Sequence, residues 1–185
     1  DLVQPLPELV KDHMVWLSSD GAKGSRLEID FFDLRQAPPM TSSFLSMMKA
    51  QGTTLYGMNF TDSQIQVADF KDADLRHTKF NSTDLRGTDF SGANFANADF
   101  TNAHLQPLEL EGGGQVGTSL ARTKCCFVDF SGADLRQVNF TEANLASANL
   151  MRAKIEGAKF KGAKVSGIRV TQEQQEYISK SIDEG

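Results

Sequence analysis

An apolar residue stands at almost every fifth position between residues 55 and 170, and this spacing constrains the fold more than any other feature. A period of five matches neither the 3.6-residue period of an α-helix nor the two-residue period of a strand, whereas a short tandem repeat explains it. The series has one break, after which it resumes in the same phase. Its members are Leu55, Phe60, Ile65, Phe70, Leu75, Phe80, Leu85, Phe90, Phe95, Phe100 and Leu105, then Leu120, Cys125, Phe130, Leu135, Phe140, Leu145, Leu150, Ile155, Phe160, Val165 and Val170.

A second, smaller residue stands two positions before most of these central residues. It is usually Ala or Thr, and Asp or Asn often lies between the two, as in Ala-Asp-Leu-Arg-His at 73–77 and Ala-Asn-Phe-Ala-Asn at 93–97. With two inward side chains in every five, a chain can wind into a square tube. The large residue then fills the interior, and the other inward position accepts only a small side chain.

These units resemble those of the pentapeptide-repeat family. The resemblance implies an all-β solenoid, a right-handed quadrilateral β-helix with four repeats per coil and about 4.8 Å between coils. The sequence adds short capping helices at both ends of this solenoid.

The flanking segments predict the two caps. Residues 1–26 are expected to form an N-terminal helix and turn, with Pro7 in the first helical turn. Residues 27–170 form the repeat domain. Residues 171–185 form a C-terminal capping helix, because Thr171 and Gln174 make a capping-box pattern and Tyr177 and Ile178 can close the end of the tube.

Two interruptions are expected within the repeat domain. Ile29 and Leu34 are predicted to be the first two repeat centres, one residue out of phase with the rest. The segment 36–52 then predicts a helical insertion, which either covers the entrance of the tube or offers Phe44 and Met48 to a partner.

The second interruption is a loop at 107–117. Gly112–Gly114 favour irregular backbone, and a buried Gln115 would cost roughly 1–3 kcal/mol. Because the phase of five survives, the loop is predicted to stand in for about two repeats, so that Phe100 would stack on Leu120.

The sequence shows no catalytic constellation, cofactor motif or metal-ligand spacing, which predicts a protein that is not an enzyme and carries no cofactor or metal. The three histidines are expected on the surface, and the many Asp residues before central residues are expected to bond nearby backbone groups. Cys125 and Cys126 are neighbours and are predicted to be free thiols, one inward and one outward, which favours a reducing compartment.

Charge divides the rod into two halves. Residues 51–111 carry nine acidic and four basic residues, whereas residues 112–170 carry four acidic and nine basic ones. The candidate partner-binding residues are therefore the loop residues Leu108, Glu109, Leu110 and Glu111 and the cations of the last coil, Lys154, Lys159, Lys161, Lys164 and Arg169.

The function expected from these features is a non-enzymatic scaffold for protein–protein interaction. The resemblance implies an alternative, a DNA mimic that binds type II topoisomerases such as gyrase, or a bacterial effector or targeting module of the same fold. We expect a protein partner, no nucleic acid or membrane, and a monomer or weak dimer. A cytoplasmic location is expected, with a lumenal or secreted one left open because the chain does not begin with Met.

Overall fold

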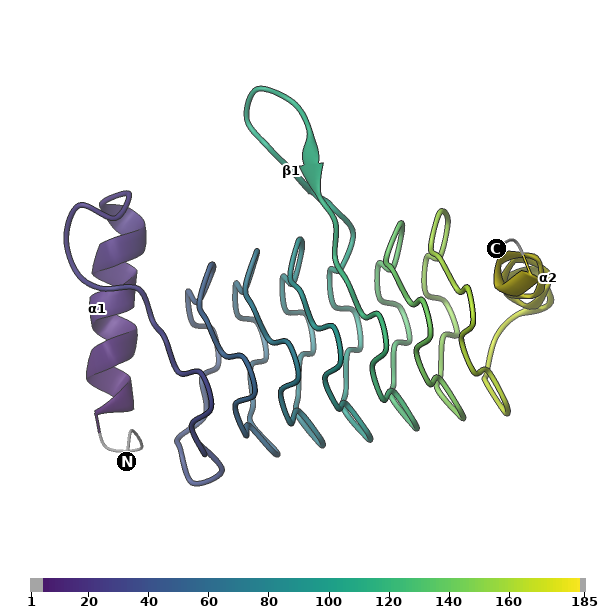
Figure 1. Ribbon diagram of the computed structural model, residues 1–185, viewed down its shortest axis with the longest axis horizontal. Coiled ribbons are helices and arrows are strands. Elements are labelled where there is room, and N and C mark those ends of the chain that lie inside the picture. Colours follow the sequence, from purple (N-terminus) through teal and green to yellow (C-terminus); the bar gives the residue numbers. More distant parts are fainter. Residues whose placement is uncertain (1–4, 184–185) are drawn as a thin grey trace.

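The chain forms a rod of stacked square coils with one helix at each end (Figure 1). The structure, a computed structural model, describes residues 5–183. Helix α1 (Leu6–Ser18) lies at the N-terminal end of the rod and helix α2 (Gln172–Asp183) at the C-terminal end. A two-stranded hairpin, β1 (Leu108–Glu109) and β2 (Gln115–Val116), projects from the side. The rod is a right-handed quadrilateral β-helix, as the resemblance to the pentapeptide-repeat family implies.

Backbone hydrogen bonds along the axis join each coil to the next. Single-residue parallel bridges link positions twenty residues apart, such as Lys49 with Asp69 and Asp69 with Asp89. The N–H of a central residue donates to a carbonyl of the next coil, as from Phe80 to Asp99 at 2.7 Å. At each corner the second residue after the centre usually has positive φ, which explains why Gly, Asn, Asp and Ser are common there.

The central residues form four columns, which define faces A to D of the rod. Nearly all of these side chains are fully buried. Going from the N-terminal to the C-terminal end, face A contains Met40, Phe60, Phe80, Phe100, Phe130 and Leu150; face B contains Leu45, Ile65, Leu85, Leu105, Leu135 and Ile155; face C contains Ala50, Phe70, Phe90, Leu120, Phe140 and Phe160; face D contains Leu55, Leu75, Phe95, Cys125, Leu145 and Val165.

The second inward position usually holds a small side chain, because it lies beside the backbone of the neighbouring coil. Some repeats bury a larger apolar residue there as well, namely Met48, Met58, Val128 and Val138. Thr is tolerated there since its hydroxyl has an acceptor within reach. Thr83 donates to the carbonyl of Phe60 at 2.8 Å, and Thr88 donates to that of Ile65 at 2.6 Å. These buried hydroxyl groups therefore cost little and add bonds between coils.

The predicted helix within 36–52 is wrong, because this segment has the repeat conformation. Phe44 bridges to Gln64, and Leu45 and Ala50 are buried repeat centres. The large Met48 occupies the position that is usually small, and it lies next to a small centre, Ala50, so the volumes compensate. Pro39 is tolerated because it lies in the first coil, where no earlier coil requires its N–H.

The predicted register across the loop is also wrong. Asp89 bridges to Ser119 and Asp99 bridges to Asp129, so stacked residues are thirty positions apart at this point. Phe100 consequently packs against Phe130, with ring centroids 5.0 Å apart, and not against Leu120. The hairpin is thus ten additional residues at one corner and replaces no repeats.

The first coil shows the predicted shift of phase. Glu28 bridges to Lys49 and Asp33 bridges to Thr54, both at a separation of twenty-one residues. Helix α1 covers this coil and is fixed to it by His13, which is fully buried. Nδ1 of His13 accepts the N–H of Leu27 at 3.0 Å, and Nε2 lies 3.0 Å from the carbonyl oxygen of Ser46.

His13 is therefore not the surface residue that the sequence predicted, whereas His77 and His104 are exposed. An imidazole that accepts with one nitrogen and donates with the other is neutral. Burial lowers the pKa of His13 and so maintains this state.

Candidate protein-binding surface

The hairpin begins where the chain leaves face B after Leu105. Pro107 at its base is buried and has no N–H that would need a partner in the coil. Leu108 pairs with Val116 and Glu109 with Gln115.

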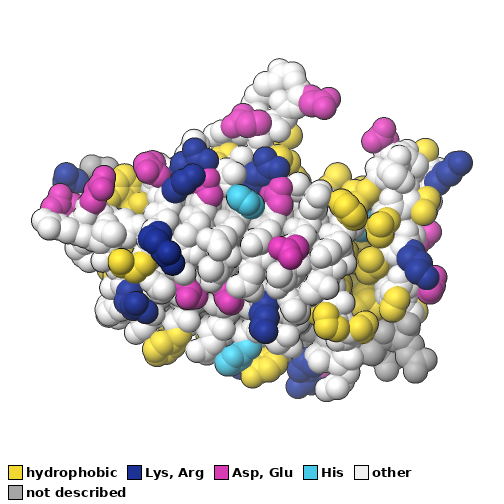
Figure 2. Space-filling view, turned by 180° about the vertical axis from the view of Figure 1, so that it is seen from behind, with side chains coloured by type: hydrophobic (Ala, Val, Ile, Leu, Met, Phe, Trp, Pro, Cys, Tyr) yellow, Lys and Arg dark blue, Asp and Glu magenta, His cyan; other side chains and the backbone are white. Residues whose placement is uncertain are grey.

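The turn of the hairpin is made by Gly112–Gly114, whose φ angles are +88°, +97° and +86°. Only glycine adopts such angles freely, so the tip depends on this triplet. The N–H of Leu110 donates to the carbonyl of Gly114 at 3.1 Å, which closes the turn. Glu109, Leu110 and Glu111 are exposed, and acidic side chains lie near the tip in Figure 2.

The base of the hairpin is seated on the rod. Val116 lies over Gly87, where a Cβ would be only 3.1 Å from its Cγ1, and Val67 lies beside it. The N–H of Gly87 donates to the side-chain hydroxyl of Thr118 at 2.9 Å, whereas the N–H groups at most other corners donate to a backbone carbonyl of the next coil. The projecting element therefore has a defined attachment.

A groove of about 340 Å³ lies between the hairpin base and the C-terminal coils. Its lining is mostly uncharged and polar, with Gln115 donating to Gln137 at 3.0 Å across it. Lys159 is the one cation among its lining residues. The groove can therefore accept polar or acidic groups of a partner that contacts the hairpin.

The other predicted cations do not join this surface. Lys154 lies on face B, Lys159 on face C, Lys164 on face D and Arg169 on face A, so they encircle the last coils. Lys161 lies at the corner between faces C and D. The structure thus brings one of the five cations to the hairpin and distributes the others around the rod.

Several carboxylates in the N-terminal half of the rod are paired with a cation of their own repeat, so the excess negative charge of this half lies on the remaining acidic residues. Asp74 and Arg76 are 2.7 Å apart, as are Asp84 and Arg86. The Arg76 guanidinium holds the pKa of the Asp74 carboxyl below its usual value. The sequence signal for these ion pairs is Asp-Leu-Arg, and the expectation that the Asp bonds only with nearby backbone groups is incomplete.

Those backbone bonds also form. Asp89 accepts the N–H of Ser91 at 2.9 Å, and Asp129 accepts that of Ser131 at 2.8 Å. In the C-terminal half, Arg136 pairs with Asp134 in the same way, but most other cations described there have no such partner. Within residues 5–183, no carboxylate lies within salt-bridge distance of Arg122, Lys124, Lys154, Lys159, Lys161, Lys164 or Arg169.

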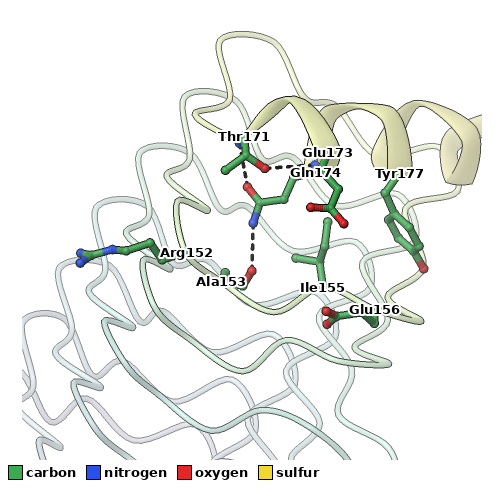
Figure 3. A pocket seen from close by; sticks show the side chains of 8 residues that line it. All are labelled: Arg152, Ala153, Ile155, Glu156, Thr171, Glu173, Gln174 and Tyr177. Atoms are coloured by element: carbon green, nitrogen blue, oxygen red, sulfur yellow. Dashed lines mark hydrogen bonds between the residues drawn. The ribbon is translucent and has the colours of Figure 1, made fainter.

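A pocket of about 270 Å³ under α2 belongs to the C-terminal cap (Figure 3). Gln174 and Thr171 form the predicted capping box, with bonds of 2.9 and 3.2 Å. The Gln174 amide also donates to the carbonyls of Leu150 and Ala153, both at 2.9 Å. Tyr177 donates to Ala158 at 3.1 Å. These polar groups close the C-terminal end of the rod.

A third hollow, of about 370 Å³, lies at the opposite end between α1 and the first coils. Met14, Leu17 and Phe44 contribute apolar side chains to it. Figure 2 shows apolar side chains gathered at this end of the molecule. Phe44 thus lies on a partly exposed surface, though in a repeat and not in a helix.

Neither a metal centre nor a membrane span is found in the described part of the chain. No group of three or more His, Cys, Asp or Glu residues within 5–183 could hold a metal ion. No helix there is long and apolar enough to cross a membrane. Cys125 is buried, Cys126 is partly exposed, and both are free thiols.

Comparison with known proteins agrees with the repeat. The family profile described as "Pentapeptide repeats" matches residues 68–106 and 118–167 in eight copies. No curated protein sequence matches the chain.

Several solved structures are similar. The pentapeptide repeat protein HetL, involved in heterocyst differentiation regulation in the cyanobacterium Nostoc sp. strain PCC 7120, is 23% identical, with a TM-score of 0.42. That alignment covers 75% of this chain and 63% of HetL. A pentapeptide repeat protein from the Arabidopsis thaliana thylakoid lumen is 24% identical over 77% of each chain, with a TM-score of 0.43.

QnrB1, a plasmid-mediated fluoroquinolone resistance protein, is 12% identical, with a TM-score of 0.46; the alignment covers 83% of this chain and 94% of QnrB1. The eight matched copies and the observed coils agree on one assignment: the chain belongs to the pentapeptide-repeat family.

Proposed function

We propose that this protein is a non-enzymatic scaffold that binds a protein partner through its hairpin. The observation that carries the proposal is the hairpin itself, a seated element that projects from an otherwise repetitive rod. Its tip presents Leu110, which is 46% exposed, between Glu109 and Glu111. A partner that buries this exposed apolar side chain gains a favourable contact, and the projecting hairpin makes the side chain accessible.

The rod supports this role by holding the hairpin in a fixed place. The axial hydrogen bonds and buried columns make each coil a rigid support for the next. The groove at the hairpin base offers polar groups and Lys159 beside the anchor, which suits the polar rim of an interface.

Deletion of residues 107–116 tests the proposal. It joins Gln106 to Gly117 and leaves Leu-Gln-Gly-Thr-Ser-Leu, a single regular repeat with glycine at the corner. We expect this variant to fold and to lose a specific protein contact. The contact is detected with a photo-crosslinking residue at position 110 of the full-length protein, in an extract of the source organism.

The matched control places the crosslinker at Ser82, an exposed corner residue on another edge of the rod. A discrete adduct at position 110, absent at position 82 and competed away by unlabelled full-length protein but not by the deletion variant, supports the proposal. Equal competition by both proteins would refute it.

The alternative role, a DNA mimic that binds gyrase, is less well supported by the charges. A DNA mimic needs a long track of negative charge comparable to that of the phosphates. Here Asp74 and Asp84 are paired with Arg76 and Arg86, and the C-terminal half is basic. We therefore expect no inhibition of gyrase supercoiling at low micromolar protein, and potent inhibition would revive the alternative.

A further inference from the structure

A second exposed surface lies diagonally across the rod from the hairpin, at the corner between faces D and A. Phe127 occupies this corner and is 65% exposed. Its φ is +59°, in the left-handed region that bulky residues avoid. Most corners of the rod carry Gly or a short polar residue at this position, so Phe is unfavourable here for both backbone and solvent.

Other large apolar residues also stand at equivalent corners. Val67 lies beside Val116 under the hairpin, and Phe31, which is 74% exposed, lies with its ring against Gly52. Phe127 differs from Phe31 in its surroundings and not in its exposure, because cations without a salt-bridge partner among the described residues stand beside it. The N–H of Phe127 donates to Ala146 at 3.1 Å, so its backbone is held firmly and its ring is presented outward.

Unpaired cations lie beside this ring on face D. Lys124 bridges to Asn144, which in turn bridges to Lys164, so the two lysines are two coils apart on the same face, roughly 10 Å. Arg122 lies in the same coil as Lys124, at the corner between faces C and D. None of the three has a carboxylate within salt-bridge distance in residues 5–183, unlike Arg76 and Arg86 in the N-terminal half.

The nearest acidic residues do not neutralise this surface. Asp129, around the corner on face A, accepts the N–H of Ser131 at 2.8 Å and the amide of Asn149 at 3.1 Å. Glu142 lies at the corner between faces C and D, one coil beyond Arg122, and is the one carboxylate on that edge of these coils. Face D between Arg122 and Lys164 is therefore cationic, with one aromatic ring at its margin.

We propose that Phe127, Lys124 and Lys164 form a docking surface for an acidic, extended protein segment that carries apolar side chains. Charge complementarity selects the acidic segment, because unpaired lysines favour carboxylates at close range. The ring supplies the apolar anchor that a purely electrostatic contact lacks. On an extended chain, carboxylates on the same side are separated by about 7 Å at alternate residues and about 13 Å at every fourth residue. The spacing of about 10 Å between the two lysine positions falls between these values, and the long, flexible lysine side chains can reach either pair of carboxylates.

A labelled peptide of about twelve residues, alternating Glu and Leu, serves as the probe, with binding followed by fluorescence anisotropy. Two further peptides, with Lys in place of Glu and with Ser in place of Leu, serve as ligand controls. We expect the full chain to bind the Glu-Leu peptide saturably, more weakly as salt is added, and at least tenfold more tightly than either control peptide.

Phe127→Asn is the decisive variant, because asparagine suits positive φ and the protein should fold with an unchanged or raised melting temperature. We expect it to weaken peptide binding at least tenfold, and Lys124→Glu with Lys164→Glu to do the same. The matched controls are Phe31→Asn, the same change at an equivalent corner, and Lys154→Glu on the opposite face. Both should bind as the parent does.

The proposal is overturned if Phe127→Asn binds as tightly as Phe31→Asn, or if the three peptides bind alike. The variant lacking residues 107–116 should retain peptide binding, since this surface does not include the hairpin. Failure of the face D proposal is therefore distinguishable from failure of the proposed hairpin function.

Discussion

Phe80 lies at the centre of the aromatic column of face A. Its ring stacks on Phe60 at 5.1 Å and on Phe100 at 4.8 Å, and it meets Phe90 edge-on at 6.1 Å. Truncation of a buried Phe to Ala costs about 3–5 kcal/mol, and each aromatic pair adds about 0.5–1.5 kcal/mol. We expect Phe80→Ala to lower the free energy of unfolding by about 5 kcal/mol.

Urea unfolding followed by circular dichroism measures this effect. For a domain of this size the melting temperature should fall by about 10–20 °C. Phe80→Leu keeps an apolar side chain and loses the ring contacts, so we expect a loss of about 1–2 kcal/mol. Phe127→Ala, at an exposed ring, should change stability by less than about 0.5 kcal/mol. A loss below about 2 kcal/mol for Phe80→Ala would show that the column does not hold the rod together.

Three further predictions concern the second inward position, the register and the N-terminal cap. Thr88→Leu should cost about 3 kcal/mol in the same urea assay, because a larger side chain does not fit and the buried hydroxyl bond is lost, whereas Thr88→Val should cost about 1 kcal/mol. In a variant without the native thiols, a disulfide should form between Asp99→Cys and Asp129→Cys, because these positions are adjacent across coils. It should not form between Asp99→Cys and Ser119→Cys. A non-reducing gel distinguishes the two pairs, and the opposite result would show that the twenty-residue register continues across the hairpin. Burial lowers the pKa of His13 from its ordinary value of 6.5, so the unfolded chain binds a proton before the folded chain does as the pH falls. The free energy of unfolding should therefore keep its full value above about pH 6.5 and decrease below it until the folded-state pKa is reached. If the His13→Gln variant shows a flat profile from about pH 7.5 to 5 where the parent does not, His13 is the cause.

The fold could be predicted from the sequence because most repeats combine a large and a small inward residue, a pattern that resembles the pentapeptide-repeat family. The capping box at Thr171 and Gln174 marks the end of the repeats. The pairing of a large and a small residue every five positions recurs often enough for the repeat to be recognised from the sequence alone.

The segment 36–52 was predicted wrongly because its residue sizes are exchanged. Met48 fills the usually small position and Ala50 the usually large one, so the repeat is disguised while the total volume is preserved. Phe44, Leu45, Met47 and Met48 meanwhile imitate the spacing of an amphipathic helix. The repeat conformation of this segment depends on its hydrogen bonds and packing against the next coil, and the sequence of a single repeat does not reveal these contacts.

The register at the hairpin could not be predicted because ten inserted residues preserve the phase of five. Two inserted repeats and one ten-residue excursion give the same positions for Leu105 and Leu120. The candidate site was affected in the same way, since the distribution of Lys154, Lys159, Lys164 and Arg169 over four faces depends on how the chain is wound.

The thirty-residue coil gives the rod a distinctive response to tension. Force applied to the two termini loads the bonds between coils one coil at a time, so the rod should peel from an end. Each ordinary coil of twenty residues releases about 70 Å of extended chain, whereas the coil between Asp89 and Ser119 releases about 105 Å. A force–extension trace would therefore show one long step among shorter, equal steps. The place of the long step in the series would show from which end the rod unfolds.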